Sequence, residues 1–209
     1  MKVLTWNING IRSVKKELDD LFRSLEYDII CVQETKVTRD QLTEDAAVVV
    51  GYNSYFSFSR GRSGYSGVAT FVKDTCTPLR AEEGVSGLLV SDKSNIIGSL
   101  GDQTRFSDEE IHSLDSEGRA VITQHKVLDE DGNERLLAIV NLYCPRADPM
   151  NEDRKVFKIH FYELLQVRVE AILNTGSHVI LLGDMNTSHK KLDHCDPAED
   201  KVIFLLFNM

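Results

Sequence analysis

Short apolar runs alternate with polar clusters along most of the chain. The runs at 3–5, 29–32 and 179–182 are rich in Val, Ile and Leu, a pattern typical of buried strands. Each run is followed by a polar cluster: Trp6-Asn7-Ile8-Asn9-Gly10, Gln33-Glu34-Thr35-Lys36 and Gly183-Asp184-Met185-Asn186. A buried strand that ends in Asn, Glu or Asp delivers an oxygen or amide group to the rim of the core. Three such ends side by side would form a pocket for Mg²⁺, which prefers carboxylates, water and substrate phosphate.

Longer stretches have the three- and four-residue spacing of amphipathic helices. Residues 12–25 form one such stretch. In 152–174 one face carries Val156, Ile159, Tyr162, Leu165, Val169 and Ile172, and Gly176 follows as a helix stop. Ser107 and Glu110 have capping-box spacing and predict a short helix. The rest of 81–115 is predicted to be loop.

Two pairs of strands are predicted to form hairpins. Residues 55–58 and 67–72 flank a basic, glycine-containing loop, and 120–123 and 136–140 flank an acidic turn at 129–133. With the strand, helix and strand of the first 35 residues, these elements indicate one α/β domain.

Composition narrows the class of protein. The chain has 209 residues, 42% of them hydrophobic and 27% charged, which suits one globular domain. A net charge of −9 argues against a general nucleic-acid coat protein, but a metal site with a local basic rim can still hold phosphate. Four cysteines without a C-x-x-C pair predict a reducing compartment with neither disulfides nor zinc. The absence of a leader or spanning segment predicts a soluble intracellular protein without membrane contact.

The carboxylates of the polar clusters each have a structural and a functional interpretation. Glu34 is a candidate metal ligand, although an ion pair with Lys36 would also explain it. Asp184 and Asn186 are two residues apart and would point to the same side of an extended chain. One could then accept a proton while the other holds a phosphate oxygen; the alternative is an Asx turn that closes the strand.

Other candidates surround these clusters. Tyr143 ends an apolar strand, and its phenol could donate to a phosphate or leaving oxygen, or it could be a tyrosine exposed at the rim. Arg119 could reach a carboxylate through a local turn and support the site. The phosphate-binding candidates are Arg12, Lys15, Lys16, Lys36, Arg39, Arg60, Arg62 and Tyr65, although a solvated turn explains the loop residues equally well. His189 and His194 are predicted to be surface residues.

Together these motifs resemble the exonuclease III and AP endonuclease family of DNA-repair phosphodiesterases. The three polar clusters occur in the family's order with Gly64-Tyr65-Ser66-Gly67-Val68, Glu117-Gly118-Arg119 and Tyr143-Cys144-Pro145, and the resemblance spans residues 1 to about 196. Longer stretches, 35–40, 51–60 and 114–119, are similar to the branch formed by the second AP endonuclease of animals.

The resemblance implies a fold, an activity and partners. The expected fold is a four-layered α/β sandwich, and the expected cofactor is Mg²⁺, with Mn²⁺ as a substitute. The expected activity is cleavage of DNA 5′ to abasic sites, with 3′–5′ exonuclease and 3′-phosphodiesterase action at blocked 3′ ends. The resemblance also implies a nuclear and partly mitochondrial location. It implies a sliding clamp as partner of the full-length animal relatives, and we expect the clamp-binding segment to be absent here.

The resemblance also implies residue roles. Glu34 corresponds to a metal ligand, and Asn7 orients it or shares the metal. Tyr143 corresponds to a catalytic phenol, and Asp184 positions or deprotonates the attacking water on the metal side of the site. Asn186 stabilises the transition state, and Asp184 and Asn186 are both expected among the metal-binding residues. Tyr65 and Arg119 correspond to DNA-side and site-supporting positions. Arg12, Arg60 and Arg62 remain substrate-binding candidates on the basis of the basic rim alone.

The C-terminal part departs from the family. A Ser-Asp-His motif that supplies the family's catalytic histidine is missing. We therefore expect an incomplete catalytic domain over residues 1–196, a divergent apolar tail over 197–209 that could form an edge strand, and impaired activity. Two alternatives are a non-catalytic fragment that binds DNA or is unstable, and a phosphodiesterase acting on inositol phosphates or lipids. The opening motif and residues 64–68 argue against the second.

Overall fold

Two four-stranded sheets pack face to face in the computed structural model, which describes residues 1–148, 150–188 and 190. The first sheet has the order β1-β2-β4-β3 and the second β5-β6-β7-β8. The strands are β1 (Val3–Asn7), β2 (Ile29–Gln33), β3 (Tyr52–Ser57), β4 (Val68–Lys73), β5 (Arg80–Glu83), β6 (Ala120–Leu128), β7 (Glu134–Tyr143) and β8 (His178–Asp184).

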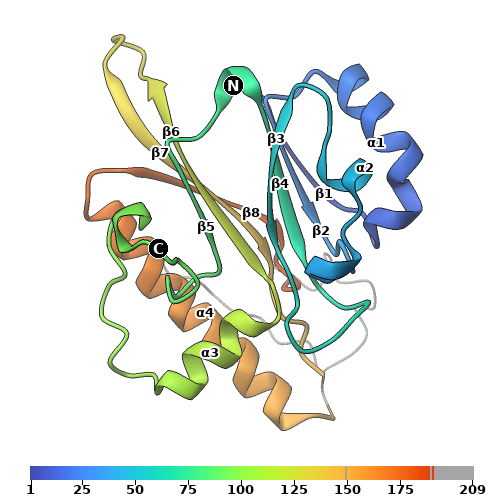
Figure 1. Ribbon diagram of the computed structural model, residues 1–209. Helices are drawn as coiled ribbons and strands as arrows, with labels where there is room; N and C mark the ends of the chain where they lie inside the picture. The colour runs from blue at the N-terminus through green and yellow to red at the C-terminus, as the bar shows by residue number, and fades with distance from the viewer. Residues whose placement is uncertain (149, 189, 191–209) are drawn as a thin grey trace.

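Helices cover the outer faces of both sheets (Figure 1). Helices α1 (Ile11–Leu25) and α2 (Glu44–Ala47) lie on the first sheet, and α3 (Asp108–Ser116) and α4 (Glu152–Leu173) lie on the second. Short 3-10 helices occur at η1 (Arg39–Gln41), η2 (Asp74–Cys76) and η3 (Lys93–Asn95). The four layers confirm the predicted α/β sandwich.

Three apolar cores lie between these four layers. Phe22 of α1 packs with Phe71 in the first, and Cys31 meets Ile139 between the two sheets. In the third, Phe161 of α4 packs with the second sheet. Burial of apolar surface stabilises a fold by about 25 cal/mol per Å², and it supplies the main driving force that holds these layers together.

Both parallel strand pairs are connected through a helix, as parallel pairing requires. Strand β1 pairs with β2 through the α1 crossover, and β7 pairs with β8 through α4. The register places Asn7 beside Gln33 and Tyr143 beside Asp184. The polar clusters therefore follow the carboxyl ends of neighbouring strands.

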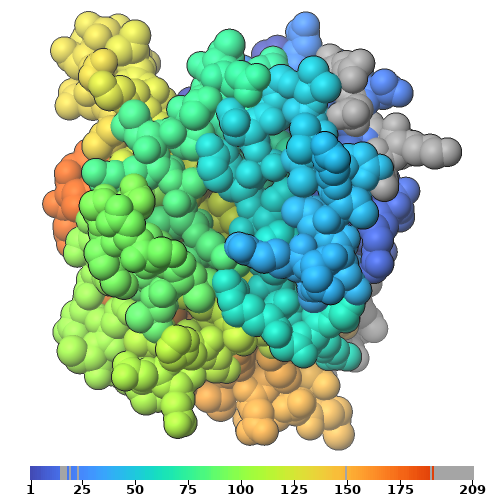
Figure 2. All heavy atoms as spheres, in the orientation of Figure 1, coloured from blue at the N-terminus to red at the C-terminus, as the bar shows by residue number. Residues whose placement is uncertain are grey.

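The two predicted hairpins are confirmed. Strands β3 and β4 pair antiparallel, as do β6 and β7. The β6–β7 turn is closed by Asp129, whose carboxylate accepts hydrogen bonds from the Asn133 amide (2.8 Å) and Arg135 Nε (2.9 Å). The tip of this hairpin protrudes from the body of the protein (Figure 2).

Some sequence predictions were wrong. The loop predicted for 81–115 contains most of β5, whose polar sequence gives little strand signal and which pairs with β6 at a sheet edge. On α4, Val156 and Ile159 are 46% and 42% exposed, because Lys158 and Arg168 take buried positions instead. Only β2 of the three predicted buried runs is buried throughout, since β1 and β8 form edges of the described sheets.

Further predictions concern membrane-spanning helices, the cysteines and the C-terminal residues. No helix in the described ranges is long and apolar enough to cross a membrane. Cys31, Cys76 and Cys144 are free thiols. The predicted apolar tail at 197–209, His189 and His194 lie outside the described residues.

The capping box at the start of α3 is present and should contribute to stability. Ser107 Oγ accepts a hydrogen bond from the Glu110 amide (3.2 Å), and the Glu110 carboxylate accepts one from the Ser107 amide (2.8 Å). We expect Ser107→Ala to lower the free energy of unfolding by about 1 kcal/mol. Urea denaturation measures this loss. Ser113→Ala, at an exposed position of the same helix, is the control and should be close to neutral.

Candidate functional site

The Asn7 side chain joins the ends of the two sheets. Its Nδ2 donates to Glu34 Oε1 (2.9 Å) and to Asp184 Oδ2 (2.9 Å). Asn7 and Asp184 are 177 positions apart in the sequence, and they belong to different sheets. The fold thus brings together the amide and the two carboxylates that the polar clusters contribute.

Glu34 follows β2 and is held by several donors. Its Oε2 lies 2.8 Å from Lys36 Nζ, so the ion pair considered from the sequence is present. Burial raises the pKa of Glu34, but hydrogen bonds from Asn7, Lys36 and Tyr143 and the charge of Lys36 outweigh burial and lower it below the ordinary value. The carboxylate is therefore ionised and oriented.

Asp184 is fixed by an Asx turn. The backbone amide of Asn186 donates to Asp184 Oδ1 (3.0 Å), and Asn186 has a left-handed backbone with φ of 50°. The prediction that these residues alternate on an extended chain was wrong, because β8 ends at Asp184 and the chain turns there. Asn186 Nδ2 donates to the Cys144 carbonyl (2.9 Å).

Asn7 orients both carboxylates through its side-chain amide, whereas Asn186 orients Asp184 through its backbone amide. Asn7 presents its nitrogen to Glu34 and Asp184, and its Oδ1 accepts the Asn9 amide at 3.0 Å. The side-chain nitrogen of Asn186 donates to the Cys144 carbonyl and to neither carboxylate. The oxygens best placed to hold a cation are those of Glu34 and Asp184, while Asn7 and Asn186 lie beside them.

Left-handed backbone is concentrated around this site. Of the six non-glycine residues with positive φ in the described ranges, five lie here: Asn9, Glu34, Lys36, Ser66 and Asn186. Ser66 belongs to the group because its carbonyl accepts the Lys36 amide at 2.9 Å. L-amino acids other than glycine rarely adopt this backbone conformation, and residues that do adopt it cluster at functional sites. Gly183 adds a φ of 126°, and a Cβ there would collide with the Leu142 carbonyl.

Tyr143 lies at the end of β7, beside Asp184 in the register. Burial, together with the charge of Glu34 and its hydrogen bond, raises the pKa of Tyr143 well above its ordinary value. The phenol therefore keeps its proton and can serve as a donor. Its ring also faces Arg119, whose Cζ lies 4.9 Å from the ring centroid.

Arg119 supports Tyr143 from within the protein. It is 3% exposed, and its Nε donates to Glu117 (2.6 Å), Nη1 to the Tyr143 carbonyl (2.8 Å) and Nη2 to Tyr65 Oη (2.9 Å). The predicted turn toward a carboxylate is thus present, with Glu117 as the partner. Arg119 therefore links the Glu117 carboxylate to both tyrosines.

Arg154 extends this network to the surface. Its Nη1 and Nη2 donate to the two oxygens of Glu117 at 2.7 and 3.1 Å. A cavity of about 220 Å³ lies next to the pair and is lined by Ser59, Gly61, Arg62, Tyr65, Ser116, Glu117 and Arg154. Sequence reasoning missed Arg154, although its place in the first turn of a long helix and the resemblance around Glu117 were both visible.

The other basic candidates differ in where they point. Arg60 forms an ion pair with Glu83 (2.9 Å). Arg62 is exposed and stacks over the Tyr65 ring at 5.0 Å. Arg12 is exposed in the first turn of α1. Arg12 and Arg62 therefore present positive charge to solvent beside the site elements.

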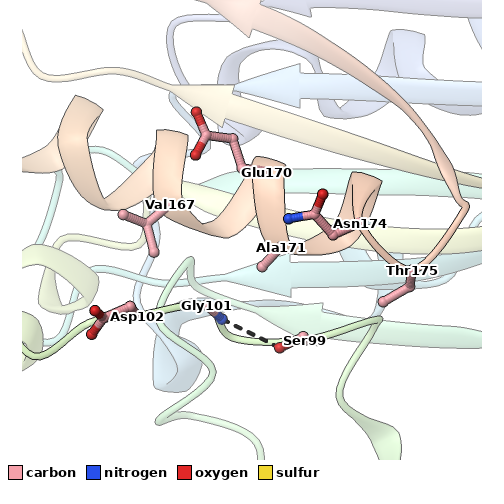
Figure 3. Close-up of a pocket in the computed structure, with 8 residues that line it drawn as sticks. All are labelled: Ser99, Gly101, Asp102, Val167, Glu170, Ala171, Asn174 and Thr175. Carbon is pink, nitrogen blue, oxygen red and sulfur yellow. Dashed lines mark hydrogen bonds between the residues drawn. The ribbon is translucent and has the colours of Figure 1, made fainter.

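A larger groove lies elsewhere. It has a volume of about 410 Å³ and runs between α4 and the 99–102 loop (Figure 3). Its lining residues are Ser99, Gly101, Asp102, Val167, Glu170, Ala171, Asn174 and Thr175. None of the predicted site residues is among them, so the chemistry and the larger groove do not coincide.

The residues present fit a hard cation with a partly open coordination shell. No group of three Asp, Glu, His or Cys side chains that could hold a metal occurs among the described residues. Glu34 and Asp184 supply two ionisable carboxylates bridged by an amide. Mg²⁺ is commonly held by one or two carboxylates with water and substrate phosphate, so this donor set suits it.

Comparison with known proteins places the chain in a family. The model of the Endonuclease/Exonuclease/phosphatase family matches residues 4–203. The chain belongs to this family. Its sequence is 57% identical over 199 residues to DNA-(apurinic or apyrimidinic site) endonuclease 2 of Xenopus laevis and 53% identical over 213 residues to the human protein of that name.

The family members differ from this chain in extent. The matches cover 95% and 94% of this chain but only 38% and 40% of the Xenopus and human proteins. The crystal structure of the Xenopus APE2 catalytic domain superimposes with a TM-score of 0.88 at 57% identity, covering 95% of this chain and 62% of that chain. A Neisseria 3′ phosphatase bound to a DNA hairpin shares the fold, with a TM-score of 0.64, 20% identity, and coverage of 94% of this chain and 62% of that chain.

Proposed function

We propose that the protein is a Mg²⁺-dependent DNA phosphodiesterase that nicks DNA 5′ to abasic sites and acts at blocked 3′ ends as a 3′–5′ exonuclease and 3′-phosphodiesterase. The observation that carries the proposal is the Asn7 amide bridging Glu34 and Asp184 across the two sheets. The Xenopus and human relatives support the choice of substrate, because their names specify apurinic or apyrimidinic sites.

Glu34 and Asp184 would hold the cation. Mg²⁺, or Mn²⁺ in its place, would supply positive charge that neutralises the developing charge on the phosphate. Glu34 is suited to this because its lowered pKa keeps it ionised at neutral pH. Asn7 and Asn186 keep the carboxylates in place through the amide contacts described above.

The remaining residues would handle the proton and the substrate. Asp184 accepts a proton from the water that attacks phosphorus, while the bond from phosphorus to the 3′ oxygen breaks and that oxygen leaves as a hydroxyl with a proton from solvent. The Tyr143 phenol donates a hydrogen bond to a phosphate oxygen. Arg12, Arg62 and Tyr65 contact the DNA backbone, with Tyr65 held by Arg119 and Arg154. DNA with abasic sites would be met in the nucleus and in mitochondria. The sliding clamp would be a partner of the longer relatives.

A labelled duplex with one abasic-site analogue tests the proposal. We expect a single Mg²⁺-dependent nick on the 5′ side of the analogue, and its loss when EDTA removes the metal. An undamaged duplex of the same sequence is the control and should remain uncut at that position. Absence of nicking with Mg²⁺ and Mn²⁺, at protein concentrations where fluorescence anisotropy detects bound duplex, would instead indicate a non-catalytic DNA-binding protein.

A further inference from the structure

Helix α4 places two polar side chains beneath the turn that carries Asp184. Lys158 is 3% exposed, and its Nζ donates to the Asn186 carbonyl (2.6 Å). Tyr162 is 4% exposed; its hydroxyl donates to the Met185 carbonyl and lies 2.9 Å from Thr187 Oγ1. The two residues are four positions apart and share one face of the helix.

The turn needs such support because its backbone is unusual. Asn186 is left-handed, which is costly for a non-glycine residue and persists only where the surroundings enforce it. From the sheet side, the Cys144 amide donates to the Asp184 carbonyl (2.8 Å), and the Cys144 carbonyl accepts Asn186 Nδ2. From the helix side, Lys158 and Tyr162 bind the next two carbonyls.

The orientation of Asp184 depends on this turn. Its Oδ1 accepts the Asn186 amide, and that amide belongs to the residue whose carbonyl Lys158 holds. A buried ammonium is expensive unless it is hydrogen-bonded, so an apolar side chain would pack at position 158 at lower cost. The charged donor is therefore explained by the carbonyl that it holds and not by packing.

We propose that Lys158 and Tyr162 are positioning residues, which hold the turn at 184–187 so that the Asp184 carboxylate faces Glu34 and can receive a divalent cation. The inference rests on the proposed function in that Asp184 is taken as a metal-side carboxylate. It extends that function by assigning the geometry of the site to α4, which contributes no residue to the Asn7–Glu34–Asp184 contact.

Lys158→Met tests the proposal, because Met keeps the length and apolar body of the side chain and removes the donor. Two readouts need no DNA cleavage: the ¹⁵N-resolved amide resonance of Asn186 in the metal-free protein, and Mn²⁺ affinity measured by calorimetry. We expect the resonance to move and Mn²⁺ to bind about 10- to 100-fold more weakly, as for loss of other groups that orient metal ligands. Lys158→Arg, which retains a cationic donor, should recover part of the affinity.

Lys155→Met is the matched control. Lys155 lies one turn earlier on the same helix and pairs with Glu152 at the surface (2.6 Å), so its loss should change neither readout. If Lys158→Met fails to fold, Tyr162→Phe removes the second donor with less disturbance and should weaken Mn²⁺ binding in the same direction.

The outcomes separate this inference from the proposed function. An unchanged Asn186 resonance and unchanged Mn²⁺ affinity in a folded Lys158→Met or Tyr162→Phe protein would overturn the positioning role, whatever the enzyme does to DNA. Weakened Mn²⁺ binding with a shifted resonance would support that role even where the unaltered protein cuts no abasic-site duplex.

Discussion

Replacing Glu34 by Gln, or Asp184 by Asn, is expected to reduce Mg²⁺-dependent nicking of abasic-site DNA by at least about 100-fold, or roughly 2.7 kcal/mol of transition-state stabilisation. Each change keeps the side chain's shape but removes a negative charge beside the cation. It also places an amide opposite Asn7 Nδ2, which donates to both carboxylates in the unaltered protein.

The rate should fall far more than stability. Glu34 is half-buried, and its ion pair with Lys36 is partly exposed, so losing the pair should cost no more than about 1 kcal/mol of unfolding free energy. Single-turnover nicking and thermal unfolding, measured on the same preparations, distinguish the two effects. The double variant should be only slightly slower than the worse single variant, because residues that act as a unit are not additive.

Asp131→Asn is the matched control. This carboxylate is exposed in the β6–β7 turn and should leave the nicking rate unchanged. Nicking by Glu34→Gln and Asp184→Asn at the rate of the unaltered protein would show that the two carboxylates do not form the reactive site.

Replacing Arg168 by Leu is expected to cost about 3–5 kcal/mol of unfolding free energy. The Arg168 and Glu82 side chains are both 0% exposed; Arg168 Nη2 donates to the two Glu82 oxygens at 2.9 and 2.7 Å. Arg168 also donates to the Ser99 carbonyl, and Glu82 accepts the Ile97 amide. The pair thereby ties α4 to β5 and to the segment before α3, and removing one partner leaves the other as an uncompensated buried charge.

The pH dependence of the Arg168→Leu variant provides a second check. Burial already raises the pKa of Glu82 in the intact pair, against the opposing effect of Arg168. Without Arg168 the pKa of Glu82 in the folded state rises further. Buried Glu82 is then tolerated in its protonated form at low pH, and its ionisation at higher pH destabilises the folded state. The stability deficit should therefore be smaller at pH 5 than at pH 8, as measured by urea denaturation.

Two comparisons sharpen this prediction. Lys126→Met breaks an exposed ion pair with Glu134 (3.1 Å) and should cost at most about 1 kcal/mol. The double variant Glu82→Leu and Arg168→Leu should recover part of the loss, although the Ile97 amide and the Ser99 carbonyl lose their partners. A pH-independent cost below about 1 kcal/mol for Arg168→Leu would contradict the importance of the pair.

The sequence predicted those elements whose own residues carry the signal. The apolar run at 29–32 and the capping box at Ser107 both give the observed structure, because β2 is buried on both faces and a cap depends on local contacts. By contrast, the strand Arg80–Glu83 has a polar sequence and exists through pairing with β6. Tertiary pairing overrides weak local preference in such a segment.

The same distinction applies to the site. Polar residues that end strands could be located in the sequence, and the strand register explains why Tyr143 lies beside Asp184. The approach of Asn7 to Asp184 depends instead on the packing of β1 against β8, which belong to different sheets. Lys158 could not be located, because a charged residue within an amphipathic helix is normally assigned to the solvent side. The sequence is compatible with an Asx turn at Asp184 and with an extended chain, and the left-handed backbone of Asn186 shows that the turn is formed.

The division of the two carboxylates between the sheets has a thermodynamic consequence. Glu34 follows a strand of the first sheet and Asp184 ends a strand of the second, so a ligand that uses both binds only when the two halves are docked. Occupancy of the site and cohesion of the sandwich are then linked equilibria, and each strengthens the other by the same free energy.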